Sequence, residues 1–210
     1  MKLTHSIIVV ALAASASANA TTGIFGSYAE ITTTSSTIYV AQSYGGSNPS
    51  FDGANFGSFT VADTLALTNA SAVTFKNGDS SNTGSDVFGA EIQWRVFKNG
   101  DTPGGFTTIG LDFEANATAT DIGGQTFSGG GDQEWRDFSG GGSADLIAAA
   151  TAGNGDYTVE IFFRSTNNGT EDTFSNNGGS NYTAQFTLVP EPSVALLGGI
   201  GLLGLLRRRR

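Results

Sequence analysis

Alternation of apolar and polar residues through the middle of this 210-residue chain constrains its fold more than any other feature. The even positions of Phe88–Val96 are apolar, whereas Glu91, Gln93 and Arg95 between them are polar. Successive side chains of a β-strand point to opposite faces, so this period predicts half-buried strands. The same period marks Phe59–Leu67, Ile109–Phe113, Tyr157–Arg164 and Tyr182–Leu188. Two residues depart from it: Asp63 interrupts an apolar face, and Phe162 interrupts a polar one.

Weaker strand signals and frequent turn residues complete the fold prediction. Further strands are expected at Ile24–Ile31, Thr37–Gln42, Ala72–Phe75 and Gly124–Phe127, and Ser143–Thr151 is the one candidate for a short helix. Clusters such as Asn99-Gly100-Asp101 are typical of turns between strands. About eight to ten strands without a long helical period predict an all-β fold, an antiparallel β-sandwich of jelly-roll type.

The distribution of charge limits the partners of the central part of the chain. Residues 21–189, which we treat as one domain, hold 18 of the 19 acidic residues but five of the ten basic ones, a net charge of −13. Such a surface repels phosphates, so no nucleic-acid partner is expected. The chain has no Cys, and its one His is His5. Residues 21–189 therefore lack the side chains for a Ser-His-Asp, Cys-His or conventional zinc site.

Residues 1–20 have the pattern of a secretory signal peptide. Lys2 precedes the apolar stretch Ile7–Ala14, and small-residue cleavage sites end at Ala18 and Ala20. The alternative is an uncleaved membrane anchor, but the apolar stretch is shorter than the roughly 20 residues that a spanning helix needs. We expect export through the secretion translocon and removal of this segment by signal peptidase.

Residues 190–210 combine a proline motif, an apolar segment and an arginine run. Pro190-Glu191-Pro192 precedes the uncharged segment Ser193–Leu206, and Arg207, Arg208, Arg209 and Arg210 follow directly. At about 1.5 Å per residue, a helix of this length spans about 21 Å, less than the roughly 30 Å hydrocarbon core. The segment therefore predicts a short transmembrane helix that is a temporary anchor, with the arginines on the cytoplasmic side.

This arrangement resembles the PEP-CTERM sorting signal of Gram-negative bacteria. The resemblance covers residues 190–210 and none of the rest of the chain. It implies that Pro190, Glu191 and Pro192 are recognised by exosortase, a membrane cysteine transpeptidase, and that Arg207–Arg210 stop transfer. Members of this family are linked to exopolysaccharide and biofilm matrix, so extracellular polysaccharide is a further expected partner. The alternative is a plain tail anchor whose prolines arose by chance.

Few side chains of residues 21–189 are candidates for chemistry. Two carboxylates about 5 to 10 Å apart could cleave a glycosidic bond, and the candidates on or beside predicted strands are Glu91, Asp112, Glu114 and Glu160. The alternative is that these are ordinary solvent-facing residues, and we expect no catalytic site. Acidic, Asn-rich loops are candidates for calcium, with hydrated turns as the alternative. These loops are Asp79–Asp86, Gly131–Asp137 and Asn167–Asp172.

The two tryptophans are candidates for stacking against sugar rings. Trp94 lies on the apolar face of its predicted strand, whereas Trp135 has polar neighbours and is the better candidate for a ligand contact. A place in the core is the alternative that we favour for both.

The sequence thus predicts an exported, non-enzymatic protein without a cofactor, anchored transiently in the membrane and then located at the cell surface or in the extracellular matrix. A carbohydrate-binding module, with or without calcium, is the first alternative for the function of residues 21–189. A two-carboxylate glycosidase is the second.

Overall fold

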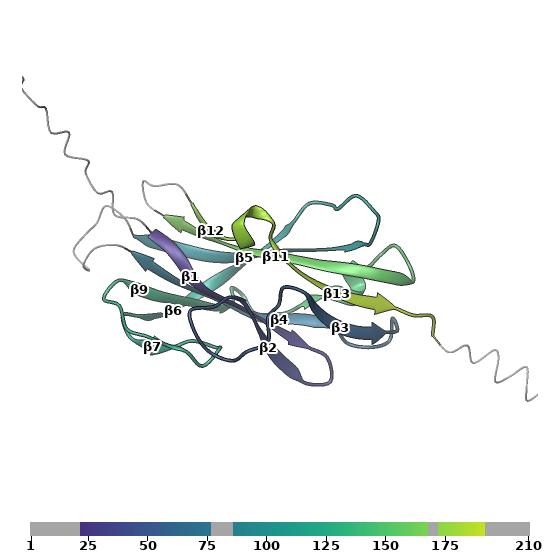
Figure 1. Ribbon diagram of the computed structural model, residues 1–210, viewed down its shortest axis with the longest axis horizontal. Helices are drawn as coiled ribbons and strands as arrows, with labels where there is room; N and C mark the ends of the chain where they lie inside the picture. Colours follow the sequence, from purple (N-terminus) through teal and green to yellow (C-terminus); the bar gives the residue numbers. More distant parts are fainter. Residues whose placement is uncertain (1–21, 77–85, 168–171, 192–210) are drawn as a thin grey trace, which may run out of the picture.

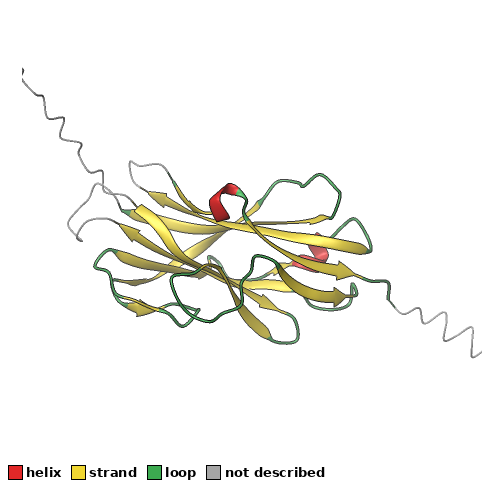
Figure 2. Ribbon diagram, viewed as in Figure 1, coloured by secondary structure: helices red, strands yellow, loops and turns green. Residues whose placement is uncertain are grey.

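The computed structural model describes residues 22–76, 86–167 and 172–191, and strands make up most of them (Figures 1 and 2). The strands are β1 (Thr22–Thr32), β2 (Ser36–Gln42), β3 (Ala54–Phe59), β4 (Ala66–Lys76), β5 (Val87–Lys98), β6 (Thr107–Asn116), β7 (Ala119–Thr120), β8 (Thr126–Phe127), β9 (Asp132–Phe138), β10 (Ala144–Asp145), β11 (Gly155–Asn167), β12 (Thr173–Ser175) and β13 (Tyr182–Leu188). Two short helices, α1 (Leu146–Ala149) and the 3₁₀ turn η1 (Asn177–Gly179), complete the described elements.

One large curled sheet organises the described residues. Its strand order is β2-β1-β4-β9-β6-β5-β11-β13-β3, with β10 beside β4 and β12 beside β11. Pairing is antiparallel along this path except between β13 and β3, which run parallel. The start of β1 and the end of β13 lie toward opposite ends of the long axis (Figure 1).

The two ends of the sheet meet at a short seam between β2 and the segment that leads into β3. The backbone N–H of Val40 in β2 donates to Pro49 at 2.9 Å, and the N–H of Phe51 donates to Val40 at 2.8 Å. The N–H of Gly53 then donates to Thr183 of β13 at 2.7 Å. Because these bonds tie both ends of the sheet to one segment, the sheet wraps around its own apolar face.

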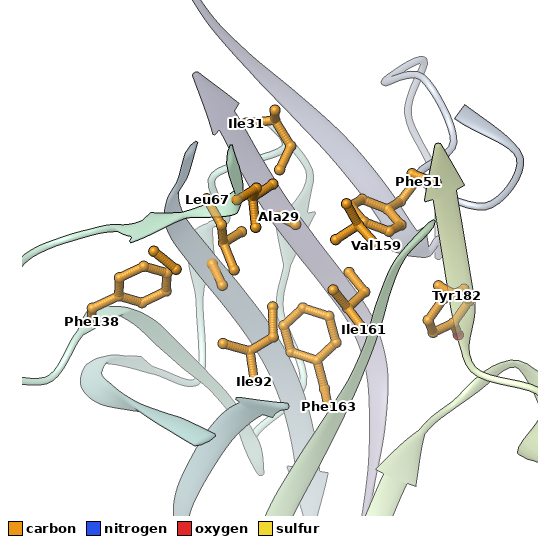
Figure 3. Packing of buried hydrophobic residues seen from close by; sticks show 14 of the residues in the cluster. Ala29, Ile31, Phe51, Leu67, Ile92, Phe138, Val159, Ile161, Phe163 and Tyr182 are labelled. Atoms are coloured by element: carbon orange, nitrogen blue, oxygen red, sulfur yellow. The ribbon is translucent and has the colours of Figure 1, made fainter. Parts of the chain in front are cut away.

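That inner face forms one hydrophobic core. Val159, Ile161 and Phe163 of β11 are almost completely buried, together with Ile92 of β5 and Phe51 from the seam. Figure 3 shows these side chains pointing into the same interior from strands that lie far apart in the sequence. A buried hydrogen-bond chain crosses this interior as well: Ser27 Oγ lies 2.9 Å from Ser175 Oγ, which lies 3.0 Å from the hydroxyl of Tyr182.

The all-β class predicted from the alternating pattern is confirmed. The clearest predicted strands fall within observed ones: Phe88–Val96 in β5, Ile109–Phe113 in β6, Tyr157–Arg164 in β11 and Tyr182–Leu188 in β13. The purely antiparallel arrangement was wrong for β3 and β13. The predicted helix at Ser143–Thr151 is reduced to the four residues of α1, whose first turn is capped by Asp145.

The prediction of a single strand over Phe59–Leu67 is wrong. Strand β3 ends at Phe59 and β4 begins at Ala66, and a turn separates them. The Asp63 carboxylate accepts hydrogen bonds from the backbone N–H of Thr60 at 2.7 Å and from its hydroxyl at 2.9 Å, which lowers the Asp63 pKa. The residue that interrupted the apolar pattern therefore closes a turn.

The described part of the chain contains no helix that is long and apolar enough to cross a membrane. The predicted signal peptide (1–20) and the predicted helix at Ser193–Leu206 both lie outside the described residues.

Truncation of one central core residue tests this packing. Phe163→Ala removes a ring that is completely buried, and loss of its contacts together with the resulting cavity should lower the free energy of unfolding by about 3–5 kcal/mol. Urea denaturation followed by tryptophan fluorescence measures this change. The control is Val61→Ala, which removes a side chain that is 64% exposed and should change stability by less than about 0.5 kcal/mol. Equal effects of the two substitutions would contradict the placement of the core.

Candidate functional site

A row of phenylalanine rings lies on the outer face of β11 and its neighbours. Phe162 sits between the buried residues Ile161 and Phe163, so its side chain points away from the core. Its ring centroid lies 4.9 Å from that of Phe106 and 6.2 Å from that of Phe174. Phe174, on β12, is 49% exposed. We call Phe106, Phe162 and Phe174 the aromatic row.

An arginine–glutamate pair closes one end of the aromatic row. The Arg95 guanidinium carbon lies 4.1 Å from the centre of the Phe106 ring, a cation–π geometry. Its Nε donates to Glu160 Oε2 at 2.7 Å and its Nη1 donates to the carbonyl of Gly104 at 2.8 Å. Asn181 Nδ2 donates to the other oxygen of Glu160 at 2.6 Å. The guanidinium is therefore held in place, and its charge is balanced by a largely buried carboxylate.

A second pair lies beside Phe162 and Phe174. Arg164 Nε donates to Glu91 Oε1 at 2.7 Å, and Arg164 Nη1 lies 3.4 Å from Asp172 Oδ2. The hydrogen bond to Glu91 raises the pKa of Arg164. Gln93 also donates to Glu91, and Thr108 donates to Gln93 at 2.9 Å. The outer face thus combines apolar rings with polar groups that already balance one another's charge.

A separate buried polar cluster lies on the outer side of β1, β4 and β9, below two loops. Glu134 of β9 is fully buried, and one of its oxygens accepts from the Ser71 hydroxyl at 3.2 Å. Arg136 Nη1 lies 3.8 Å from the other oxygen. The Tyr44 hydroxyl donates to the buried Asp121 carboxylate at 2.6 Å, and Asp121 accepts from the N–H of Gln125 at 2.8 Å. Asp121 therefore joins the loop that carries Tyr44 to the turn between β7 and β8.

Burial controls the ionisation of this cluster. It raises the pKa of Glu134, and the attraction of Arg136 and the hydrogen bond from Ser71 only partly oppose this. Burial and the neighbouring Asp121 also raise the pKa values of Tyr28 and Tyr44, which keeps both hydroxyls protonated.

Trp135 belongs to the hydrophobic core, so the hypothesis that it contacts a ligand is not supported by its position. Its side chain is 7% exposed, its Nε1 donates to Thr74 Oγ1 at 3.3 Å, and its ring packs edge-on against Phe113 with 5.3 Å between centroids. Trp94 is half-buried and packs against the same core. The core placement favoured for both tryptophans thus holds for Trp135, whereas Trp94 lies partly buried at the edge of the core.

The four carboxylates considered for glycoside cleavage all have partners. Glu91 and Glu160 pair with Arg164 and Arg95, Glu114 pairs with Arg136, and Asp112 accepts from the Ser139 hydroxyl. The described residues form two open pockets, and none of these four carboxylates is part of the lining of either one. The first, of about 370 Å³, is lined by Thr33, Thr34, Ser58, Phe59, Ala62, Asp63 and Thr64. The second, of about 260 Å³, is lined by residues from β5, β11, α1 and the loops beside them, Asp101 among them.

One of the three candidate calcium loops is a strand. Gly131–Asp137 falls almost entirely in β9, where Glu134 and Trp135 are buried and Asp132 accepts from the N–H of Gly129 at 2.7 Å. Most of Asp79–Asp86 and of Asn167–Asp172 lies outside the described residues. Within the described ranges, no cluster of three or more acidic or histidine side chains is arranged to hold a metal ion.

The predicted sorting motif begins where the sheet ends. Strand β13 ends at Leu188, and the N–H of Val189 donates to the carbonyl of Phe59 at 2.8 Å. Pro190 and Glu191 follow as exposed residues without regular structure. Pro192, Arg207–Arg210 and the predicted cleavage sites at Ala18 and Ala20 lie outside the described residues.

Comparison with protein-family models, with curated proteins and with solved structures finds no match to this chain. The class of the protein is therefore defined by the fold described above: an all-β protein built on one curled sheet, with an aromatic row on its outer face.

The buried carboxylate of Glu134 gives a testable pH dependence. Its folded-state pKa is raised, so the folded protein binds this proton more tightly than the unfolded chain does. Relative to Glu134→Gln, the wild type should therefore gain stability as the pH falls from 8 toward the ordinary carboxyl range near 4. Thermal unfolding of both proteins across this range measures the difference. The control is Glu30→Gln, because the Glu30 side chain is only partly buried. This ionisation of Glu134 is contradicted if the stability of all three proteins changes equally with pH. It is also contradicted if Glu134→Gln gains more stability than the wild type as the pH falls.

Proposed function

We propose that this chain is an exported cell-surface or extracellular-matrix protein that is sorted by an exosortase. This proposal depends mainly on the order of three features in the sequence: Pro190-Glu191-Pro192, a short apolar segment and four arginines. The position of Pro190 supports it, because proline has no N–H to continue the β13 ladder and the chain leaves the sheet at this residue. Pro190 and Glu191 are exposed, so this part of the motif is accessible to a membrane enzyme.

In this proposal, residues 21–189 are a structural or binding domain without catalytic activity. The domain has neither His nor Cys. Its best carboxylate candidates are held by arginine or serine partners away from the two open pockets.

We further propose that the curled sheet acts as a β-sandwich of jelly-roll type. One layer would contain β2, β1, β4, β9 and β6, and the other β5, β11, β13 and β3 with β12. The buried hydrogen bond between Ser27 of β1 and Ser175 of β12 supports this division. These two strands are not neighbours in the sheet, so their side chains meet across the interior.

A carbohydrate-binding module is the second candidate function for residues 21–189. The aromatic row favours it, since the exposed ring of Phe174 and the partly buried rings beside it lie next to polar side chains, a suitable surface for sugar rings. In the calcium-assisted form of this candidate, an ion would be held by acidic loops.

Intact-mass analysis of the protein isolated from its native host tests the sorting proposal. The expected mature chain lacks residues 1–20 and ends near the Pro190-Glu191-Pro192 motif, without Arg207–Arg210. Pro192→Ala should leave the C-terminal segment attached, because it changes the motif that the enzyme reads. Pro103→Ala, in an exposed loop, is the matched control and should be processed normally. A native protein that retains Arg210, or equal processing of both variants, would contradict the proposal.

A further inference from the structure

We propose that the outer face around the aromatic row binds an uncharged polysaccharide chain. This inference rests on the proposed role of residues 21–189 as a non-catalytic extracellular domain. It assigns the binding surface to β5, β11, β12 and the start of β6 with the preceding Phe106, and the ligand to a class defined by apolar ring faces and neutral hydroxyl groups.

The apolar part of the surface is the aromatic row itself. The exposed ring of Phe174 continues into the partly buried rings of Phe162 and Phe106, and a contiguous apolar patch of this kind can mark an interaction site. Phe174 offers nearly half of its surface to solvent, and Phe162 and Phe106 are half-buried beside it. Phenylalanine has no polar group, so these rings can only contribute apolar contacts. The C–H face of a pyranose ring is a partner of this kind.

The polar part of the surface runs alongside the aromatic row. Glu91, Gln93 and Thr108 are joined by hydrogen bonds, and Arg164 holds the Glu91 carboxylate from the next strand. A carboxylate accepts about four hydrogen bonds and an amide group forms several. Glu91 and Gln93 therefore retain the capacity to bond sugar hydroxyls, while their positions are already fixed. Fixed polar groups beside apolar rings give orientation and specificity at low entropic cost.

Charge selects the class of polysaccharide. The two guanidinium groups of this face are balanced by Glu160, Glu91 and Asp172, which leaves no surplus positive charge to attract an anion. The domain carries a net charge of −13, so an anionic polysaccharide would be repelled over the whole surface. An uncharged chain needs no positively charged partner and is not repelled by the negative charge of the domain.

Affinity electrophoresis and glycan-array binding of the purified full-length chain test this proposal. The uncharged probes are dextran, xylan and a linear β-glucan, and alginate and hyaluronate are the anionic probes. At least one uncharged probe should bind, and the anionic probes should not. Phe174→Ala and Phe162→Ala should each weaken binding at least tenfold. Since Phe162 is half-buried, Phe174→Ala keeps the test valid if the other variant fails to fold.

The matched control is Phe88→Ala, which removes a ring that is 61% exposed but lies outside the aromatic row. It should change binding less than twofold. Three results would each overturn the proposal: no uncharged probe binds, Phe88→Ala weakens binding as much as Phe174→Ala does, or light scattering shows a dimer that Phe174→Ala dissociates. None of these results bears on the mass of the native protein, so failure of this inference and failure of the sorting proposal are distinguishable.

Discussion

The structure depends on one constraint, which is that a single sheet must cover its own apolar face. The described helices are too short to bury it, since α1 has four residues and η1 has three. The sheet therefore curls until its two ends meet, and the backbone bonds between Val40 and the Pro49–Phe51 segment hold them together. Inside, the Ser27–Ser175–Tyr182 chain satisfies polar groups that would otherwise be costly to bury.

Because the core fills the inner face of the sheet, aromatic rings on the outer face need a separate explanation. Once the inner face is filled by residues such as Ile161 and Phe163, packing of the core no longer requires an aromatic side chain on the opposite face of β11. Phe162 nevertheless lies there, in line with Phe106 and Phe174 from different segments of the chain. Arg95 reinforces the row through its contact with Phe106 while it neutralises Glu160. This face is the surface that we propose for polysaccharide binding.

The sequence predicted those elements whose two faces differ in polarity. Strand β11 was recognised because buried and solvent-facing residues alternate along it, and Phe162 was visible as the exception in that pattern. Strand β9 lacks this pattern because both of its faces are covered: Trp135 packs inward, and Glu134 is buried on the outer side below the loops. The turn at Asp63 was missed since apolar residues happen to continue the period on both sides of it. The alignment of Phe106 and Phe174 with Phe162 depends on long-range strand pairing, which no local pattern reveals.

In the proposed function, residues 21–189 lie outside the cell. Treatment of intact native cells with trypsin tests it most directly, because Lys98 precedes the exposed loop after β5. The account predicts that intact cells lose the full-length domain and release peptides cut at Lys98 while a cytoplasmic marker stays whole. Protection of the domain until the cells are lysed, followed by cleavage at Lys98, would contradict it.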